Sequence, residues 1–412
     1  MTAQPRTAHA NPWTPRVVAQ LAVLAAAAFV YVTAEILPVG ALSAMAAGLR
    51  VREGVVGSLL AWYALVAALT TVPLVRWTAH WPRRRALLLA LGCLAASQII
   101  SALAPNFAVL VAGRVLCAVT HGLLWSVIAP IATRLVPASH FGRATTAIYV
   151  GSSLGLVVGV PLMARLSLSW GWREAVGCVA VAAVVVLLAV RALLPAMALD
   201  PDQQTRVGAG AHHLRNTRLV AVSGLTLAVV AGHFVSYTFI LKIIQDVVGL
   251  DDPRAVSWLL AGFGIAGVAA MTAIARPLDR RPSAVVIVCM AVLSGTFLVL
   301  TAVAVAGGHT PVTVAAGAVA ILLWGAMAAT VAPILQSAAM RTAPADPDGA
   351  SGLYVTAFQI GIMAGALTGG FLYDRAGPAV MLAASTMMFV AALTAITATR
   401  RVFQVSAATG PT

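Results

Sequence analysis

One acidic residue lies deep inside a long apolar segment of this chain. Glu35 is the only carboxylate well inside any of the apolar runs. An ionised carboxylate is costly to bury in lipid, so such a residue normally faces a cavity or takes up a proton when it is enclosed. Glu35 is therefore a candidate for binding and releasing protons as its surroundings alternate. The alternatives are a carboxyl group kept neutral for structure, or one that lies shallow beside Pro38.

A second group of polar residues shares one helix face. Arg114, His121 and Trp125 are separated by seven and four residues, so a helix places them on the same side. A buried arginine needs a partner, and Glu35 on a neighbouring span is the expected one. We predict that Glu35, Arg114 and His121 handle protons. The alternative is that Arg114 lies near the outer end of its span and only braces helices.

Other polar and aromatic residues inside apolar segments suit the binding of an organic molecule. His233 and Tyr237 are four residues apart and share a helix face, and an imidazole can relay protons or form hydrogen bonds with a ligand. Aromatic walls with a few polar groups are typical of binding pockets. The predicted substrate-binding residues are Tyr63, Trp125, His233, Tyr237, Trp324 and Gln359, with Trp62 as a further cavity residue. The alternative is that these histidines and tryptophans only pack.

Ser153 lies in a Gly-x-Ser-x-Gly pattern that also occurs in hydrolases. That pattern needs a strand, a turn and a helix around the serine, whereas Ser153 lies within an apolar run. Glycines at 151, 155 and 159 recur every fourth position, which favours close helix packing. An intramembrane serine hydrolase with His121 as its base remains a remote alternative.

Composition identifies the environment of these residues. The 412-residue chain is 61% hydrophobic and 9% charged, whereas soluble domains are about 25% charged. Its net charge of +14 comes from short arginine clusters between apolar runs, a topology signal rather than a nucleic-acid surface. The four cysteines show no paired spacing, and no phosphate-binding loop is present. We therefore expect no metal, no cofactor and no nucleic-acid partner.

The apolar runs predict an all-α membrane protein with twelve transmembrane helices in two six-helix bundles. The expected spans are 17–47, 54–77, 86–104, 107–135, 144–166, 172–194, 219–247, 255–275, 283–306, 312–340, 350–373 and 378–399. The expected organisation is a cytoplasmic N-terminus at 1–16, bundles at 17–195 and 218–400, a cytoplasmic linker at 196–217 and a cytoplasmic tail at 401–412. Arginine lies mainly on the side of the termini, which predicts that both termini are cytoplasmic.

A weak internal repeat relates the two halves. Leu123-Leu124-Trp125 recurs as Leu322-Leu323-Trp324, and the spacing of Arg134 to Pro137 matches that of Arg341 to Pro344. Internal repeats are the usual construction of secondary transporters.

Several motifs resemble those of a known family. They are Thr33 to Gly40, Arg114 to Gly122, Gly155 to Pro161, Gly232 to Tyr237, and Gly370 to Arg375. Over essentially its whole length, the chain resembles the major facilitator superfamily, in particular its bacterial drug and sugar efflux branch. The chain is similar to sugar exporters of the arabinose-efflux type and to chloramphenicol-resistance exporters. The resemblance places Arg114 at a position associated with proton transfer.

The chain departs from the family pattern in two places. The basic run Arg83-Arg84-Arg85 is present, but Val75 and Ala79 replace the expected Gly and Asp, whereas Asp279 with Arg280 retains the pattern in the second half. The resemblance thus implies gating roles for Arg83, Arg84, Asp279 and Arg280. In the fifth span, Val160 separates Gly159 from Pro161, which the antiporter pattern joins directly.

The resemblance implies a secondary transporter, and not an enzyme, in the bacterial inner membrane. We expect it to export sugars or drugs such as amphenicols in exchange for protons by alternating access, and to act as a monomer within the lipid bilayer. A proton-coupled uptake symporter for sugars or nucleosides is the main alternative, and a channel is a third possibility.

Overall fold

The computed structural model describes residues 12–197 and 214–398. The first half contains α1 (Pro15–Gly40), α2 (Leu42–Leu49), α3 (Glu53–Trp77), α4 (Arg83–Ala102), α5 (Phe107–Arg134), η1 (Ala138–His140), α6 (Phe141–Leu154), η2 (Gly155–Gly159), α7 (Val160–Trp170) and α8 (Trp172–Leu193). The second half contains α11 (Thr217–Tyr237), α12 (Ile240–Lys242), η3 (Ile243–Val247), α13 (Pro253–Arg280), α14 (Pro282–Ala306), α15 (Pro311–Thr342) and α16 (Pro347–Ala398).

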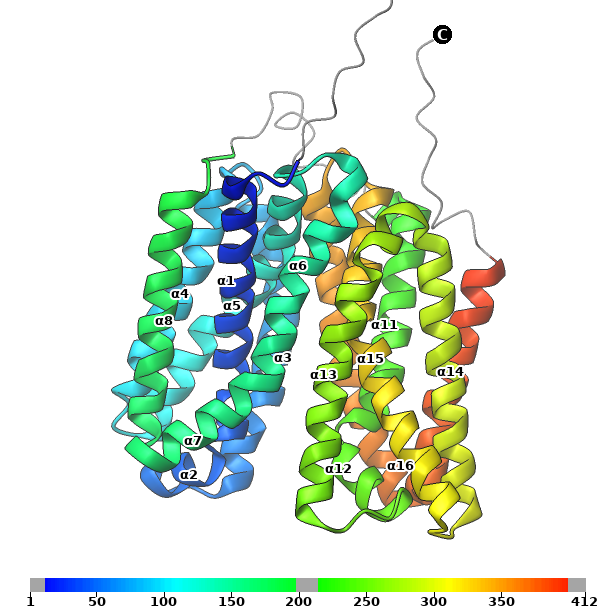
Figure 1. Cartoon of the computed structure of the whole chain (residues 1–412). Coiled ribbons are helices and arrows are strands. Elements are labelled where there is room, and N and C mark those ends of the chain that lie inside the picture. The colour runs from blue at the N-terminus through cyan, green and yellow to red at the C-terminus, as the bar shows by residue number, and fades with distance from the viewer. Residues whose placement is uncertain (1–11, 198–213, 399–412) are drawn as a thin grey trace, which may run out of the picture.

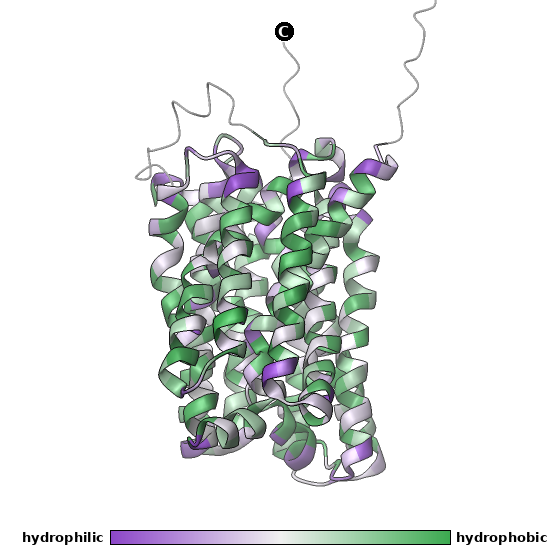
Figure 2. Cartoon of the chain, turned by 90° about the vertical axis from the view of Figure 1, so that its left-hand side faces the viewer, coloured by the Kyte–Doolittle hydropathy of each residue, from purple (hydrophilic) through white to green (hydrophobic). Residues whose placement is uncertain are grey.

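These helices account for the twelve predicted crossings. Within the described residues, nine helices are long and apolar enough to cross a membrane, and the bent unit of α6, η2 and α7 makes a tenth. The 52-residue α16 contains two helices that meet at Gly377, whose φ of 77° only glycine adopts easily, so α16 crosses twice. The 25-residue α3 supplies the remaining crossing. Figure 2 shows apolar residues along the middle of the helices and hydrophilic residues near both ends.

Two predicted spans are interrupted. The span expected at 17–47 is α1 followed by α2, with a break at Ala41, and the span expected at 219–247 ends as an α-helix at Tyr237. Helix starts follow ordinary rules: Asn106, Asn216 and Asp252 each accept a hydrogen bond from a backbone N–H of the helix they precede. The linker at 196–217 and the tail at 401–412 lie largely or wholly outside the described residues, so these assignments stay predictions.

Figure 1 shows two helix groups side by side, with α1 beginning and α16 ending at the same end of the molecule. We call this end the terminus side.

Each half contains a helix pair held together by a stripe of glycines. A Cβ atom at Gly151 of α6 or Gly155 of η2 would strike the backbone of α1, and one at Gly365 or Gly369 of α16 would strike the backbone of α11. The predicted close packing is confirmed and recurs in the second half.

The extra residue Val160 is accommodated by a change of helix type. Immediately before it, Gly155–Gly159 form a π-helix, η2, within the α6–α7 unit. A π-helical turn takes in one residue more than an α-helical turn, so an insertion is absorbed locally. The glycines before the insertion thus keep their contact with α1.

Candidate functional site

A buried polar cluster in the first half begins at a proline. Pro38 lies inside α1 and lacks the N–H that would bond the carbonyl of Ala34. Arg114 of α5 supplies the missing donor: Nη1 donates to the carbonyl of Ala34 and Nη2 to that of Glu35, both at 2.6 Å. The expectation that Arg114 would form an ion pair with the Glu35 carboxylate is therefore wrong, because both terminal nitrogens of Arg114 donate to backbone carbonyls instead.

The Glu35 carboxylate instead lies beside a histidine. Its Oε2 atom is 3.7 Å from Nδ1 of His121. The same ring nitrogen lies 3.1 Å from the hydroxyl of Tyr63. When Nδ1 carries no proton, it accepts a hydrogen bond from Tyr63. In the other tautomer, the Nδ1–H group faces the oxygens of both Glu35 and Tyr63. Arg114 contributes its positive charge nearby and stacks over the Tyr63 ring at 4.9 Å. Glu35, Arg114, His121 and Tyr63 thus form one cluster, as predicted for the first three.

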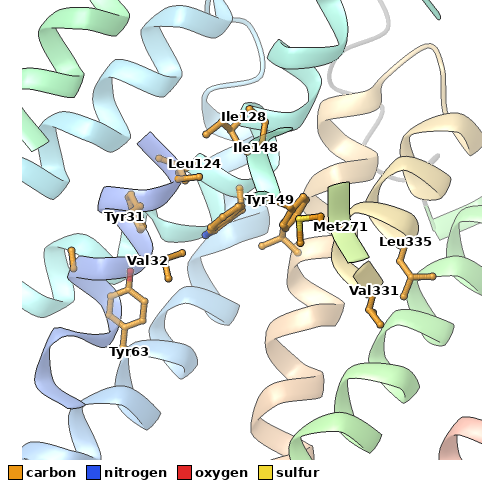
Figure 3. Packing of buried hydrophobic residues seen from close by; sticks show 14 of the residues in the cluster. Tyr31, Val32, Tyr63, Leu124, Ile128, Ile148, Tyr149, Met271, Val331 and Leu335 are labelled. Atoms are coloured by element: carbon orange, nitrogen blue, oxygen red, sulfur yellow. The ribbon is translucent and has the colours of Figure 1, made fainter. Parts of the chain in front are cut away.

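Further polar contacts hold this cluster. The Tyr31 hydroxyl donates to the carbonyl of Cys117 at 2.9 Å, and the Tyr63 hydroxyl lies 3.3 Å from the Cys117 sulfur. In Figure 3, the hydroxyl of Tyr63 points toward Tyr31. On its other side, the Tyr63 ring lines a shallow recess between α3 and α5 together with Arg114 and Trp62, which is 63% exposed. The cluster is therefore buried but borders an accessible surface.

The predicted residues of the second half form an aromatic cluster. Trp324 Nε1 donates to His233 Nδ1 at 2.9 Å, and the His233 ring stacks on Tyr237 at 4.8 Å. Phe263 and Phe297 pack against Trp324. Trp324 is fully buried, whereas the His233 and Tyr237 side chains are half-buried. Those two rings are therefore the accessible part of this cluster.

Gln359 has an unusual position for an amide. It is buried in α16, and its Nε2 atom has no hydrogen-bond partner in the structure. Buried amide donors are normally paired, so an unpaired one is a candidate for binding a ligand or water. This geometry agrees with the predicted role in substrate binding, which itself stays a prediction.

Ion pairs join the two halves on the terminus side. Asp348, at the start of α16, forms ion pairs with two arginines of the first half, with Arg83 at 2.7 Å and with Arg134 at 3.1 Å. Asp348 and Arg83 are almost completely buried. The carboxylate that Ala79 cannot provide is thus supplied from the opposite half.

The other predicted gating pair has a different partner. Asp279 pairs with Arg143 of the first half at 2.7 Å, and its other oxygen accepts from the backbone N–H of Gly142. Arg280, which follows Asp279 in the family pattern, is exposed at the end of α13 and takes no part in this ion pair. Arg84 donates to the carbonyl of Leu194 within its own half. Arg83 and Asp279 therefore contact the other half, and Arg84 and Arg280 do not bridge the halves.

A buried amide also joins the two halves. Gln336 of α15 accepts from the Tyr149 hydroxyl at 2.8 Å and donates to the Trp125 carbonyl at 2.9 Å. It also donates to the Ser351 hydroxyl at 2.7 Å. Figure 3 places Tyr149 at the boundary, next to Met271 of the second half. Sequence reasoning missed Gln336, although an amide within an apolar run was the same signal that identified Gln359.

The hydrolase alternative finds little support in the structure. Ser153 lies within helix α6 rather than at a turn after a strand. Over residues 12–197 and 214–398, no group of three or more His, Cys, Asp and Glu residues could hold a metal ion. The four cysteines are free.

Comparison with known proteins gives a consistent picture. Residues 24–366 match the family model of the Major Facilitator Superfamily. Two proteins named chloramphenicol efflux pumps, from two strains of Mycobacterium tuberculosis, are each 63% identical over 394 residues, covering 96% of this chain and 95% of theirs.

Solved structures share the fold at low sequence identity. The transporter FucP, described in the outward conformation, has a TM-score of 0.74 at 15% identity and covers 95% of this chain and 100% of its own. The human organic anion transporter MFSD10 has a TM-score of 0.73 at 19% identity, covering 93% of this chain and 100% of its own. The predicted fold is thereby confirmed.

Proposed function

The chain belongs to the Major Facilitator Superfamily, and from this premise we propose that it exports amphenicol-type molecules from the cytoplasm in exchange for protons. It is a multi-pass membrane transporter, and its 63% identical relatives are named chloramphenicol efflux pumps. The proposed location is the bacterial inner membrane with both termini cytoplasmic, as the arginine distribution favours. The terminus side then faces the cytoplasm.

The observation that carries the proton part of the proposal is the position of Glu35. Its carboxylate lies at 3.7 Å from His121, close to the recess lined by Tyr63 and Arg114. A carboxyl group in such a place binds a proton when sealed from water and releases it when water enters. Alternating access supplies that change of environment once in each cycle.

The second half supplies the proposed binding surface for the drug. An amphenicol carries an aromatic ring, an amide and hydroxyl groups. The half-buried rings of His233 and Tyr237 offer stacking surface, and the unpaired amide of Gln359 offers hydrogen bonds. Coupling arises because the carboxylate in one half and the drug surface in the other face a passage that opens to one side at a time.

The conformation of the structure fits the state of an exporter before it binds a proton. The ion pairs of Asp348 and Asp279 and the bridge through Gln336 close the terminus side. In the proposed orientation, Glu35 is then reached from outside the cell, where protons enter.

Inside-out vesicles with an acidified lumen test this function. Amphenicols and sugars would be added to the bath, which corresponds to the cytoplasm, while a dye reports luminal pH. We expect amphenicols to release protons from the lumen of wild-type vesicles but not of Glu35→Gln vesicles. A symporter would instead carry protons inward with the substrate and acidify the lumen. No response beside a working control antiporter would contradict amphenicol export.

A further inference from the structure

Gln336 has every polar atom of its side chain engaged at the boundary between the halves. Its carbonyl oxygen accepts from Tyr149, and its amide nitrogen donates to the Trp125 carbonyl and to Ser351. The side chain is fully buried. Two of the three bonds cross from α15 to α5 and α6 of the other half. They cannot persist when the halves separate on this side, because hydrogen bonds require heavy-atom distances near 3 Å.

The two crossing bonds end on neighbouring residues, one on the Tyr149 hydroxyl and one on the Trp125 carbonyl. The Trp125 ring stacks on Tyr149 with ring centres 5.6 Å apart and planes 19° apart. The same ring lies 6.3 Å from His121. His121 in turn lies 3.7 Å from the Glu35 carboxylate. A continuous series of contacts therefore runs from Glu35 to Gln336.

The surroundings make these bonds costly to lose. Tyr149 and its neighbours Met271, Val331 and Leu335 form a buried apolar layer near Gln336. In such a layer, a polar group that loses its partner also lacks water, so the penalty is larger than at a surface. The bridge is thus stable only while Trp125 and Tyr149 keep their present positions.

We propose that Gln336 couples the protonation of Glu35 to the opening of the terminus side. When Glu35 is ionised, its contact with His121 holds the Trp125 and Tyr149 rings in place, and Gln336 keeps the halves together. Proton uptake by Glu35 weakens the contact with His121, the rings shift, and Gln336 loses both crossing bonds. The other titratable groups around Glu35 are Arg114 and Cys117 of α5 and Tyr63 of α3, and Arg114 is bound to the carbonyls of Ala34 and Glu35. This role rests on the proposed proton exchange at Glu35, but not on the identity of the substrate.

The test measures the distance between the halves on the terminus side. Spin labels would be placed at the exposed positions Ser139 and Ala345 through cysteine substitutions, with Cys93 and Cys178 replaced by alanine. Distances would be recorded without substrate by electron spin resonance. We expect Gln336→Leu to raise the ratio of open to closed molecules roughly tenfold, as for the loss of two buried hydrogen bonds. Ser337→Ala is the matched control, because Ser337 donates only to the carbonyl of Ile334 in its own helix.

Coupling itself is tested by combining substitutions. Glu35→Gln, which imitates the protonated carboxyl, should open the terminus side in the wild-type background and add nothing in Gln336→Leu. Tyr149→Phe keeps the ring but removes one crossing bond, so its effect should be smaller and not additive with that of Gln336→Leu. Equal distances in wild type and Gln336→Leu, or fully additive effects of Glu35→Gln and Gln336→Leu, would overturn the proposal.

The two proposals can fail separately. If Gln336→Leu and Glu35→Gln shift the distances as expected while vesicles release no protons on amphenicol addition, the coupling role of Gln336 is supported and only the substrate is refuted. If vesicles respond to amphenicols but Gln336→Leu leaves the distances unchanged, the export function stands and the role of Gln336 is refuted.

Discussion

Each half places a tryptophan beside a histidine, but the two halves surround that pair differently. In the first half, His121 and Trp125 share α5 and lie beside Glu35 and Arg114. In the second half, the tryptophan N–H is bonded to a histidine on another helix, and further aromatic rings pack against both residues. The scaffold is repeated, down to the glycine stripes that pack α6 on α1 and α16 on α11, whereas the chemistry is not.

This difference assigns separate tasks to the halves. A titratable carboxyl with a fixed arginine can respond to protons, and a ring cluster without a carboxylate offers only shape and stacking. Substitutions in the first half should therefore change proton coupling, and those in the second half should change the affinity for the drug. The following predictions test that division, from the largest expected effect to the smallest.

Glu35→Gln should abolish drug accumulation against a gradient, because the glutamine amide cannot carry a proton. Binding and downhill exchange of the drug should remain, since the second half is unchanged. Measurement of drug efflux from energised cells and of drug exchange in vesicles would separate the two activities. Glu174→Gln, at an exposed carboxylate in the first turn of α8, should leave both intact. Loss of exchange in Glu35→Gln would mean that Glu35 also binds the drug.

Arg114→Leu should strongly destabilise the first half, by about 2 kcal/mol for each carbonyl left unpaired at Ala34 and Glu35. Pro38→Ala restores the helical N–H that can bond Ala34. The double variant Arg114→Leu, Pro38→Ala should therefore melt at a higher temperature than Arg114→Leu alone. Thermal unfolding in detergent measures this difference. If Pro38→Ala gives no rescue, the two bonds of Arg114 are not what holds α1.

Trp324→Phe removes the N–H that binds His233 but keeps most of the ring. We expect KM for amphenicols to rise about three- to tenfold, the effect of a lost neutral hydrogen bond, with the number of protons moved per drug unchanged. Transport assays with simultaneous pH recording measure both quantities. A changed proton count would break the proposed division between the halves.

Deletion of Val160 should have the smallest effect. The π-helix at Gly155–Gly159 should become an α-helix, and the glycine contacts with α1 should be kept. Export should fall less than threefold, within the range expected for a change absorbed locally. Drug resistance of cells expressing the variant measures this. Misfolding of the deletion variant would show that the extra residue is needed to position α7.

Much of the fold followed from hydropathy, because a lipid environment requires long apolar helices. Glu35 and Arg114 were recognisable for the same reason, since charged groups stand out against apolar runs. The partner of Arg114 was misjudged because charge attraction was considered without the carbonyl that Pro38 leaves free. That signal is local and present in the sequence, four residues after Ala34.

The contacts between the halves were harder to predict. Asp348 and Arg143 lie at helix ends, where charged residues are common, and nothing in their own segments identifies a partner more than a hundred residues away. Gln336 was overlooked because its bonds to Tyr149 and Trp125 exist only once α15 faces α5 and α6. Such pairings depend on the packing of whole bundles rather than on local pattern.

The inter-half ion pairs described above have their charges divided by half. The arginines of these pairs, Arg83, Arg134 and Arg143, belong to the first half, and both aspartates, Asp348 and Asp279, belong to the second. Two copies of the first half brought together would oppose arginine to arginine, and two copies of the second would oppose aspartate to aspartate, whereas unlike halves attract. In a protein built from repeated halves, this charge distribution favours the association of a first half with a second half as the chain emerges from the ribosome. Separately produced halves should accordingly find each other rather than themselves.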